Sequence, residues 1–378
     1  MYFWPVAGIY LHIPFCKQQC TYCDFHFSTT FEAYREEMVN SIARELVSRV
    51  SYLEDKPIET IYFGGGTPSI LRKDEIAKLL ETINSTFQVN PNAEISLEAN
   101  PDDISVDSLK EWKELGINRL SIGLQSFKED DLRWMNRAHT VDEAQNCVRL
   151  AQSEGFDNLT VDLIYGLPNL TLEEWRNHVR TVIDFDVPHI SAYCLTVEEK
   201  TVLHKLVKTG KIDSVSDDTQ GEQFLELLKM LEAKEYQQYE ISNFSKPGFE
   251  SKHNGNYWKG KWYLGVGPSA HSFNGTSRRW NIANNRRYLK AIEEETTCSE
   301  TEELSVENQF NERILIGLRT ILGVNLNELE AVSTPPKVFY DKMGSFIESN
   351  WMIRQNSAIS LTKEGRLRAD YIASELFI

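Results

Sequence analysis

The chain has 378 residues and a formal net charge of −16 at pH 7, with 41% hydrophobic and 25% charged residues. This length exceeds what a single hydrophobic core supports, so we expect a globular protein of two domains. The acidic charge argues against a nucleic-acid partner, because phosphate contacts require clustered Lys and Arg. No stretch approaches the ~18 apolar residues of a transmembrane helix.

Residues 1–15 are apolar, but they carry neither a basic lead-in nor a small-residue cleavage site. We therefore interpret them as leading into the first strand and not as a signal peptide. Without a targeting segment, we expect a cytoplasmic protein.

The first half of the chain alternates strand-like and helix-like segments. Apolar, β-branched runs predict strands at 8–13, 60–63, 94–98, 119–124, 159–165 and 189–195. The segments between them predict helices at 34–49, 73–86, 105–115, 141–154 and 172–184. Strands that are apolar on both faces are typical of a parallel sheet covered by helices. About six such units predict an α/β fold, a partial (β/α)₆ barrel, with its chemistry at the C-terminal ends of the strands.

The pattern changes after about residue 219. A helix at 221–234 and a strand at 236–241 lead into an aromatic- and glycine-rich stretch at 244–280. From about 305, the order helix, helix, strand, strand, helix predicts a small winged-helix-like α+β domain. We therefore divide the chain into a barrel (1–220), a connecting segment (221–300) and a C-terminal domain (301–378). The acidic charge favours a lid or partner-docking role for the last domain over DNA binding.

Three cysteines, Cys16, Cys20 and Cys23, follow the first predicted strand. Three thiolates without a nearby fourth suit a [4Fe-4S] cluster with one iron open to a ligand. Structural zinc would need a fourth protein ligand, and the other cysteines are over a hundred residues away. A redox pair of Cys20 and Cys23 would leave Cys16 without a role. The cluster is the interpretation that uses all three.

The spacing Cys-x₃-Cys-x₂-Cys, with Tyr22 before the last cysteine, resembles the signature of radical-SAM proteins. This resemblance implies that the cluster binds S-adenosylmethionine (SAM) and cleaves it to a 5′-deoxyadenosyl radical. The glycine loop 64–68 then resembles the loop that holds the methionine amino group of SAM, although a plain turn also uses glycine.

Polar residues stand at or near the ends of the later strands. Glu98 and Gln125 close strands three and four, Arg137 lies in WMNRAH, and Asp162 lies in strand five. Singly, such residues often cap helices or bond loops. As a set, the carboxylates suit the ribose hydroxyls and sulfonium of SAM, and Arg137 suits its carboxylate.

The segments YLHIPFCKQQCTYCDF, FGGGTP, SLEANP, SIGLQSF, WMNRAH and VDLIYGLP together resemble the oxygen-independent coproporphyrinogen III oxidase group of radical-SAM proteins. The resemblance is close over 8–195 and continues into the C-terminal domain. It implies that the SAM contacts are Tyr10, Gly65, Gly66, Thr67, Glu98, Gln125, Arg137 and Asp162.

That group has two branches. The oxidases carry a long N-terminal extension and a fourth cysteine two residues after the third, whereas here the first strand begins within ten residues of Met1 and Phe25 stands at the cysteine position. The other branch, the HemW-type heme chaperones, is marked by His-Asn-x-x-Tyr-Trp, which residues 253–258 match. The resemblance therefore implies a heme carrier with an iron–sulfur cluster and SAM. Oxidative decarboxylation of coproporphyrinogen III is the alternative, and radical chemistry on another substrate is a third.

The resemblance directs attention to His253, Tyr257 and Trp258. An imidazole nitrogen of His253 can ligate iron, and Tyr257 and Trp258 offer flat apolar area to a macrocycle. Nearby Arg278 and Arg279 could pair with propionates. A histidine beside aromatics is, however, more often a packing residue, and the motif could equally shape the wall over the cluster. We expect heme, SAM and heme-accepting proteins as partners, and either a monomer or a dimer.

Overall fold

The computed structural model describes residues 6–378. Residues 1–5, part of the apolar N-terminus interpreted above as leading into the first strand, lie outside the described residues. No helix within 6–378 combines the length and the apolar character needed to cross a membrane.

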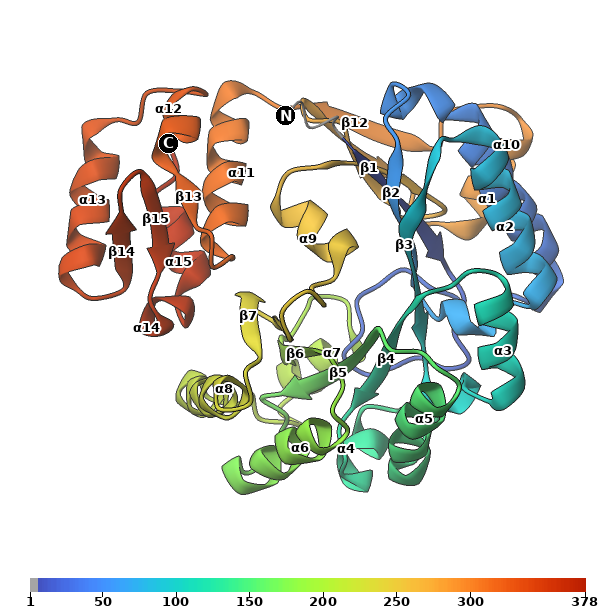
Figure 1. Ribbon diagram of the computed structural model, residues 1–378, viewed down its shortest axis with the longest axis horizontal. Helices are drawn as coiled ribbons and strands as arrows, with labels where there is room; N and C mark the ends of the chain where they lie inside the picture. The colour runs from blue at the N-terminus through green and yellow to red at the C-terminus, as the bar shows by residue number, and fades with distance from the viewer. Residues whose placement is uncertain (1–5) are drawn as a thin grey trace.

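Six parallel strands form the centre of the protein and pair in chain order. They are β1 (Ala7–Ile13), β2 (Ile58–Gly65), β3 (Val89–Ala99), β4 (Arg119–Gln125), β5 (Leu159–Tyr165) and β6 (His189–Cys194). The connecting helices cover the outer face of the curved sheet (Figure 1): α1 (Arg35–Ser48), α2 (Lys73–Thr86), α3 (Val106–Glu114), α4 (Glu129–Trp134), α5 (Val141–Ser153) and α6 (Leu172–Asp184). Helix α7 (Val202–Lys208) follows β6 and packs on the loop after β1. The predicted α/β partial barrel is confirmed.

Local signals set the helix ends. Thr171 caps α6, because its side chain accepts a hydrogen bond from the backbone N–H of Glu174 while the Glu174 carboxylate accepts from the Thr171 backbone. This reciprocal capping satisfies two N–H groups that a helix start otherwise leaves unpaired. Thr140 and Glu143 repeat the arrangement at α5.

The sheet extends beyond the six strands on both sides and has twelve strands among the described residues, in the order β12-β11-β10-β9-β1-β2-β3-β4-β5-β6-β8-β7. The added strands are β7 (Gln237–Glu240), β8 (Asn243–Ser245), β9 (Trp262–Val266), β10 (His271–Phe273), β11 (Ser277–Asn281) and β12 (Ser299–Glu303). Strand β9 pairs parallel with β1, so chain from late in the sequence lies beside the first strand. Helices α8 (Asp217–Glu232) and α10 (Asn285–Glu293) pack against α6 and α1.

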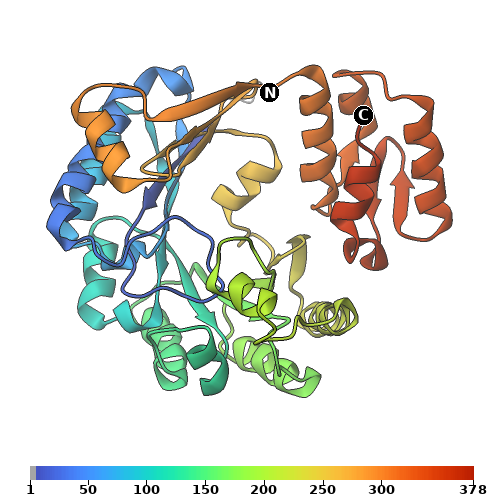
Figure 2. The same cartoon turned by 180° about the vertical axis from the view of Figure 1, so that it is seen from behind.

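Helix α9 (Lys252–Trp258), which contains the HNGNYW segment, lies on the open, concave side of the sheet in both views (Figures 1 and 2). Its first turn is held by the buried carboxylate of Glu94 from β3, which accepts hydrogen bonds from the backbone N–H groups of Lys252 (3.1 Å) and His253 (3.0 Å). A carboxylate at a helix N-terminus satisfies unpaired N–H groups and complements the helix dipole. Tertiary contacts therefore fix this seven-residue helix.

The C-terminal part forms a small α+β unit around a three-stranded antiparallel sheet, β13-β15-β14. Its elements are α11 (Val306–Leu318), β13 (Val324–Asn325), α12 (Leu326–Glu330), α13 (Lys337–Glu348), β14 (Met352–Gln355), β15 (Ala358–Leu361), α14 (Lys363–Arg366) and α15 (Ala369–Glu375). Asn356 takes a positive φ of 55° in the turn between β14 and β15. The two predicted strands are confirmed, and β13 adds a third.

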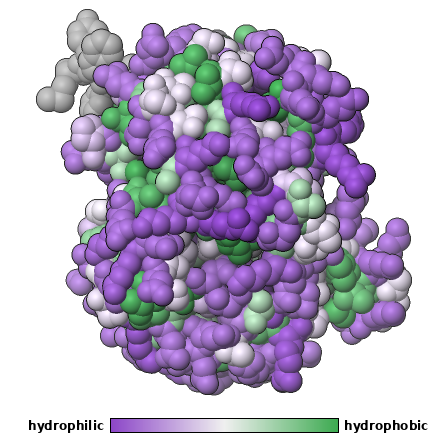
Figure 3. Space-filling model, turned by 90° about the vertical axis from the view of Figure 1, so that its right-hand side faces the viewer, coloured by the Kyte–Doolittle hydropathy of each residue, from purple (hydrophilic) through white to green (hydrophobic). Residues whose placement is uncertain are grey.

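Two hydrophobic cores support these parts. One runs from Ala7 to Cys298 and the other from Phe310 to Leu376. Residues of 221–300, such as Leu264 and Tyr288, belong to the first core. The three-part division of the chain stays a prediction. The side of the barrel that carries α1 and α2 is mainly hydrophilic, and its apolar side chains form small patches (Figure 3).

Candidate functional site

The three cysteines lie in the loop after β1, and none of them forms a disulfide. The turn after α4 holds this loop: Thr21 N donates to Met135 O (3.1 Å), and Asn136 Nδ2 donates to Gln19 O (2.6 Å). On the other side, the Leu203 backbone N–H of α7 donates to Thr21 O (2.8 Å). The loop is thus fixed from two sides before any ligand is considered, and Figure 2 shows it in dark blue.

A cavity of about 420 Å³, the cysteine cavity, is lined by Cys16, Cys20 and Cys23. Seven of the eight predicted SAM contacts line it too: Gly65, Gly66, Thr67, Glu98, Gln125, Arg137 and Asp162. No three His, Cys, Asp or Glu side chains within 6–378 converge on a position for a single metal ion. A cubane does not require such convergence, because each thiolate binds a different iron. Three unpaired thiols on one cavity fit that cluster.

The glycine loop packs directly on the cysteine loop. The backbone N–H groups of Gly66 and Thr67 donate to Ile13 O (2.8 Å) and Phe15 O (2.6 Å). A Cβ on Gly66 would lie 2.5 Å from Phe15 O, so no side chain fits there. Gly65 has a positive φ of 107°, which also favours glycine. The Thr67 hydroxyl donates to Cys16 Sγ (3.3 Å), which ties the loop to a cluster ligand.

Arg137 lines the cysteine cavity and has one nitrogen without a hydrogen-bond partner among the described residues. Its Nη1 donates to Cys20 Sγ (3.6 Å), and its Nη2 donates to Asn100 Oδ1 (2.7 Å) and Gly123 O (2.8 Å). Its Nε is buried without a hydrogen-bond partner among the described residues. Gln125 takes a left-handed φ of 68°, a conformation that costs a non-glycine residue about 1–3 kcal/mol and clusters at ligand sites. Both features fit a cavity built for a polar ligand.

Two carboxyl groups of the cysteine cavity are largely buried. Glu98 accepts a hydrogen bond from the Tyr62 hydroxyl (2.8 Å), and burial raises the pKa of Glu98 to about 7. Asp162 accepts from the Ser121 hydroxyl (3.2 Å), and burial raises its pKa to about 6. Burial disfavours the charged form, so both groups titrate close to neutral pH. A bound cation such as a sulfonium would favour their ionised forms.

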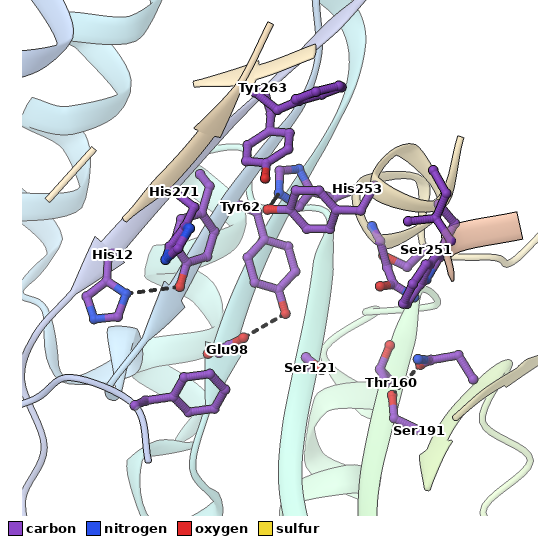
Figure 4. Close-up of a pocket in the computed structure, with 18 of the residues that line it drawn as sticks. His12, Tyr62, Glu98, Ser121, Thr160, Ser191, Ser251, His253, Tyr263 and His271 are labelled. Carbon is purple, nitrogen blue, oxygen red and sulfur yellow. Dashed lines mark hydrogen bonds between the residues drawn. The ribbon is translucent and has the colours of Figure 1, made fainter. Parts of the chain in front are cut away.

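A second cavity of about 610 Å³, the lumen cavity, fills the barrel interior. It shares Asp24, Phe25, Glu98, Ser121 and Tyr193 with the cysteine cavity, so the two cavities are adjacent. Tyr257 and Trp258, predicted to face a macrocycle, line it, and so does Tyr10, which was predicted as a SAM contact and does not line the cysteine cavity. Five of the eight histidines of the chain also line it: His12, His26, His189, His253 and His271. Figure 4 shows Tyr62 bonded to Glu98, with Thr160 and Ser191 across the cavity from His12 and His271.

His253 is buried, with 2% of its surface exposed, and both ring nitrogens are engaged. Hydrogen bonds of 2.8 Å join Nδ1 to Thr60 Oγ1 and Nε2 to the Tyr257 hydroxyl. Its ring stacks on Tyr62 at a centroid distance of 4.9 Å. Burial lowers the pKa of His253 to about 3, so the ring is neutral. Iron ligation by His253 would first require one of these hydrogen bonds to break.

The sequence alone did not point to Tyr62, Asn100 or Arg119, which also line these cavities. A signal for Tyr62 is present. Thr60 and Tyr62 lie two residues apart in β2, and alternate residues of a strand face the same side. Nothing local distinguishes Asn100, which sits just after β3, or Arg119, which opens β4.

Comparisons with known proteins agree with this geometry. Residues 10–182 match the model of the Radical SAM superfamily. The heme chaperone HemW of Bacillus subtilis (strain 168) is 34% identical over 366 residues, which cover 96% of this chain and 97% of that protein. The chain belongs to the HemW family of radical-SAM proteins. This membership confirms the resemblance drawn from the cysteine spacing and the HNGNYW segment.

The heme chaperone HemW of Lactococcus lactis subsp. lactis (strain IL1403) is 32% identical and covers 94% of this chain and 93% of its own. Among solved structures, coproporphyrinogen III oxidase (HemN) from Escherichia coli, a radical SAM enzyme, has a TM-score of 0.86. That match covers 99% of this chain and 90% of HemN at 22% identity. At this identity the likeness shows a shared fold.

Proposed function

We propose that this member of the HemW family is a heme chaperone: it binds heme and passes it to acceptor proteins, carrying a [4Fe-4S] cluster with SAM. The observation that carries the proposal is that the lumen cavity, lined with aromatic and histidine side chains, lies next to the cavity of the three cysteines and shares lining residues with it. Relatives that match almost the whole chain bear the name heme chaperone HemW, which supports the same function.

Cys16, Cys20 and Cys23 would hold the cluster. A bound cluster with SAM supplies one-electron chemistry at this cavity. The guanidinium of Arg137 would orient the SAM carboxylate, and the glycine loop would lie beside its amino group. Glu98 and Asp162 would face the cation and the ribose hydroxyls. Each of these assignments uses a group that already lines the cysteine cavity.

Heme would occupy the lumen cavity, where Tyr10, Tyr257 and Trp258 offer flat surfaces to a macrocycle. The cavity volume falls in the ~300–1,000 Å³ range of small-molecule sites. We assign His253 the role of a positioning residue that fixes α9 and orients Tyr257, because both of its nitrogens are occupied.

The test is anaerobic reconstitution of the cluster with SAM, followed by heme titration and a coproporphyrinogen III assay on the same sample. We expect a saturable Soret shift, release of heme to an apo-globin and no protoporphyrinogen. Failure to bind heme at stoichiometric concentration would refute the proposal.

Formation of protoporphyrinogen in the same assay would favour the oxidase instead. Phe25, 64% exposed, stands where the sequence resemblance places a fourth cysteine in the oxidases. A matched sample of Phe25→Cys tests whether that position alone changes the outcome.

A further inference from the structure

Arg119, the first residue of β4, is a buried cation without a carboxylate partner. Only 2% of its surface is exposed. Its Nη1 donates to the Asn158 side-chain oxygen and to Phe249 O (3.4 Å), and its Nη2 donates to the Thr160 hydroxyl (2.6 Å). Among the described residues, no Asp or Glu forms an ion pair with it. A guanidinium has five N–H donors, so three neutral oxygens leave both charge and donors for an anion.

Asp162, which lines the cysteine cavity, is close enough to Arg119 for the guanidinium charge to act on its pKa, which that charge lowers. Its carboxylate accepts hydrogen bonds from the Ser121 hydroxyl and not from the guanidinium. Burying a charge without a directly bonded counter-ion is costly. Arg119 therefore has the properties of a residue that awaits an external anion.

His189, the first residue of β6, adds a second unsatisfied group at the same end of the lumen. It is 1% exposed; its Nε2 is joined to the Tyr239 hydroxyl (2.9 Å), and its Nδ1 is buried without a partner among the described residues. Arg119 and His189 both line the lumen cavity. Thr160 and Ser191, which line it too, are labelled in Figure 4. Arg119 and His189 are the first residues of β4 and β6, so they lie at the opposite end of the barrel from the cysteines.

The lumen cavity therefore has an aromatic body and one cationic end. Tyr62, Tyr257 and Trp258 line the body, and Arg119 lies at the end. A planar aromatic ligand with a carboxylate arm matches both features. We propose that Arg119, aided by His189, binds a carboxylate of the ligand. This inference rests on the proposed function, in which that carboxylate is a propionate of heme. It implies that the propionate edge of the macrocycle enters the lumen first.

Arg278 provides the contrast. It also lines the lumen cavity, and the sequence suggested it as a propionate partner. In the structure its Nε donates to Glu312 of α11 and its Nη1 donates to the Tyr263 hydroxyl (3.3 Å). Its charge is therefore already neutralised, whereas that of Arg119 is not.

The test compares heme with heme dimethyl ester, in which both propionates are capped and uncharged. A hydrogen bond to a charged group contributes enough free energy for an affinity difference of about tenfold to a hundredfold. We expect the wild-type protein to bind heme more tightly than the ester by that factor. Arg119→Met should bring the ratio of the heme affinity to the ester affinity close to one, and Arg119→Lys should retain part of the wild-type ratio. Arg278→Met is the matched control and should keep the wild-type ratio.

The outcomes separate this inference from the proposed function. If wild-type protein binds heme and the ester equally well, the inference is wrong and the chaperone proposal stands. If it binds neither, the chaperone proposal itself fails. Loss of the ratio in Arg278→Met but not in Arg119→Met would overturn the assignment. Should Arg119→Met fail to fold, the wild-type ratio and Arg119→Lys still decide the result.

Discussion

Replacing His253 by alanine separates a structural role from a ligand role. The ring is 2% exposed and bonds to Thr60 and Tyr257 at 2.8 Å each. Its removal leaves two buried hydroxyls unpaired and opens a cavity beside Tyr62. Unpaired buried groups and large-to-small substitutions together make a loss of about 4 kcal/mol in unfolding free energy reasonable. For a domain of this size that corresponds to a Tm lower by about 8–16 °C.

The assay is thermal unfolding of His253→Ala without heme, followed by a heme titration at a temperature where the variant is folded. His271→Ala is the control, because His271 lines the same cavity but is exposed. We expect its Tm to change by less than about 2 °C. An unchanged Tm for His253→Ala, together with loss of a histidine-ligated heme spectrum, would refute the structural role and establish His253 as the ligand.

Three further expectations follow from the cysteine cavity and the core. Arg137→Met removes the guanidinium that lines the cysteine cavity and should weaken SAM binding to the reconstituted protein by about tenfold or more, measured by equilibrium dialysis. Because burial raises the pKa of Glu98 to about 7, SAM affinity should increase from about pH 6 to 8, and Glu98→Gln should flatten that increase. The folded state holds this proton more tightly than the unfolded chain, so Glu98 makes the unfolding free energy fall as pH rises from about 4.5 to 7. Glu45→Ala leaves buried Arg49 without its carboxylate and breaks the bond from Tyr288 (2.7 Å), so denaturant unfolding should show a loss of about 3–5 kcal/mol.

Local sequence signals predicted much of the barrel. The predicted helices at 73–86 and 172–184 and the predicted strand at 159–165 agree with α2, α6 and β5 at both ends. Capping residues and apolar periodicity act over a few residues, so they can be read directly from the sequence. The cysteine loop, the glycine loop and the polar strand ends met in one cavity because parallel strands end on the same side of the sheet.

Long-range contacts explain what the sequence did not reveal. Helix α9 is only seven residues long and depends on Glu94, more than 150 residues away, so no local pattern predicts its place in the lumen. For the same reason His253 could not be assigned before Thr60 was known to face it. Strand β13 has two residues and pairs only with β15, which is too short for any periodicity. Whether Arg119 has a carboxylate partner is likewise a property of the fold.

The pairing of β1 with β9 has a consequence for how the protein is made. Ala7 lies opposite Trp262, so roughly 250 residues must be synthesised after β1 before its second neighbour exists. At about 5–20 residues per second, that interval lasts roughly 12–50 s. Through that period one edge of β1 stays open to other chains, and the thiols that follow it stay open to oxidants. The cysteine loop therefore follows a strand whose second neighbour is made about 250 residues later.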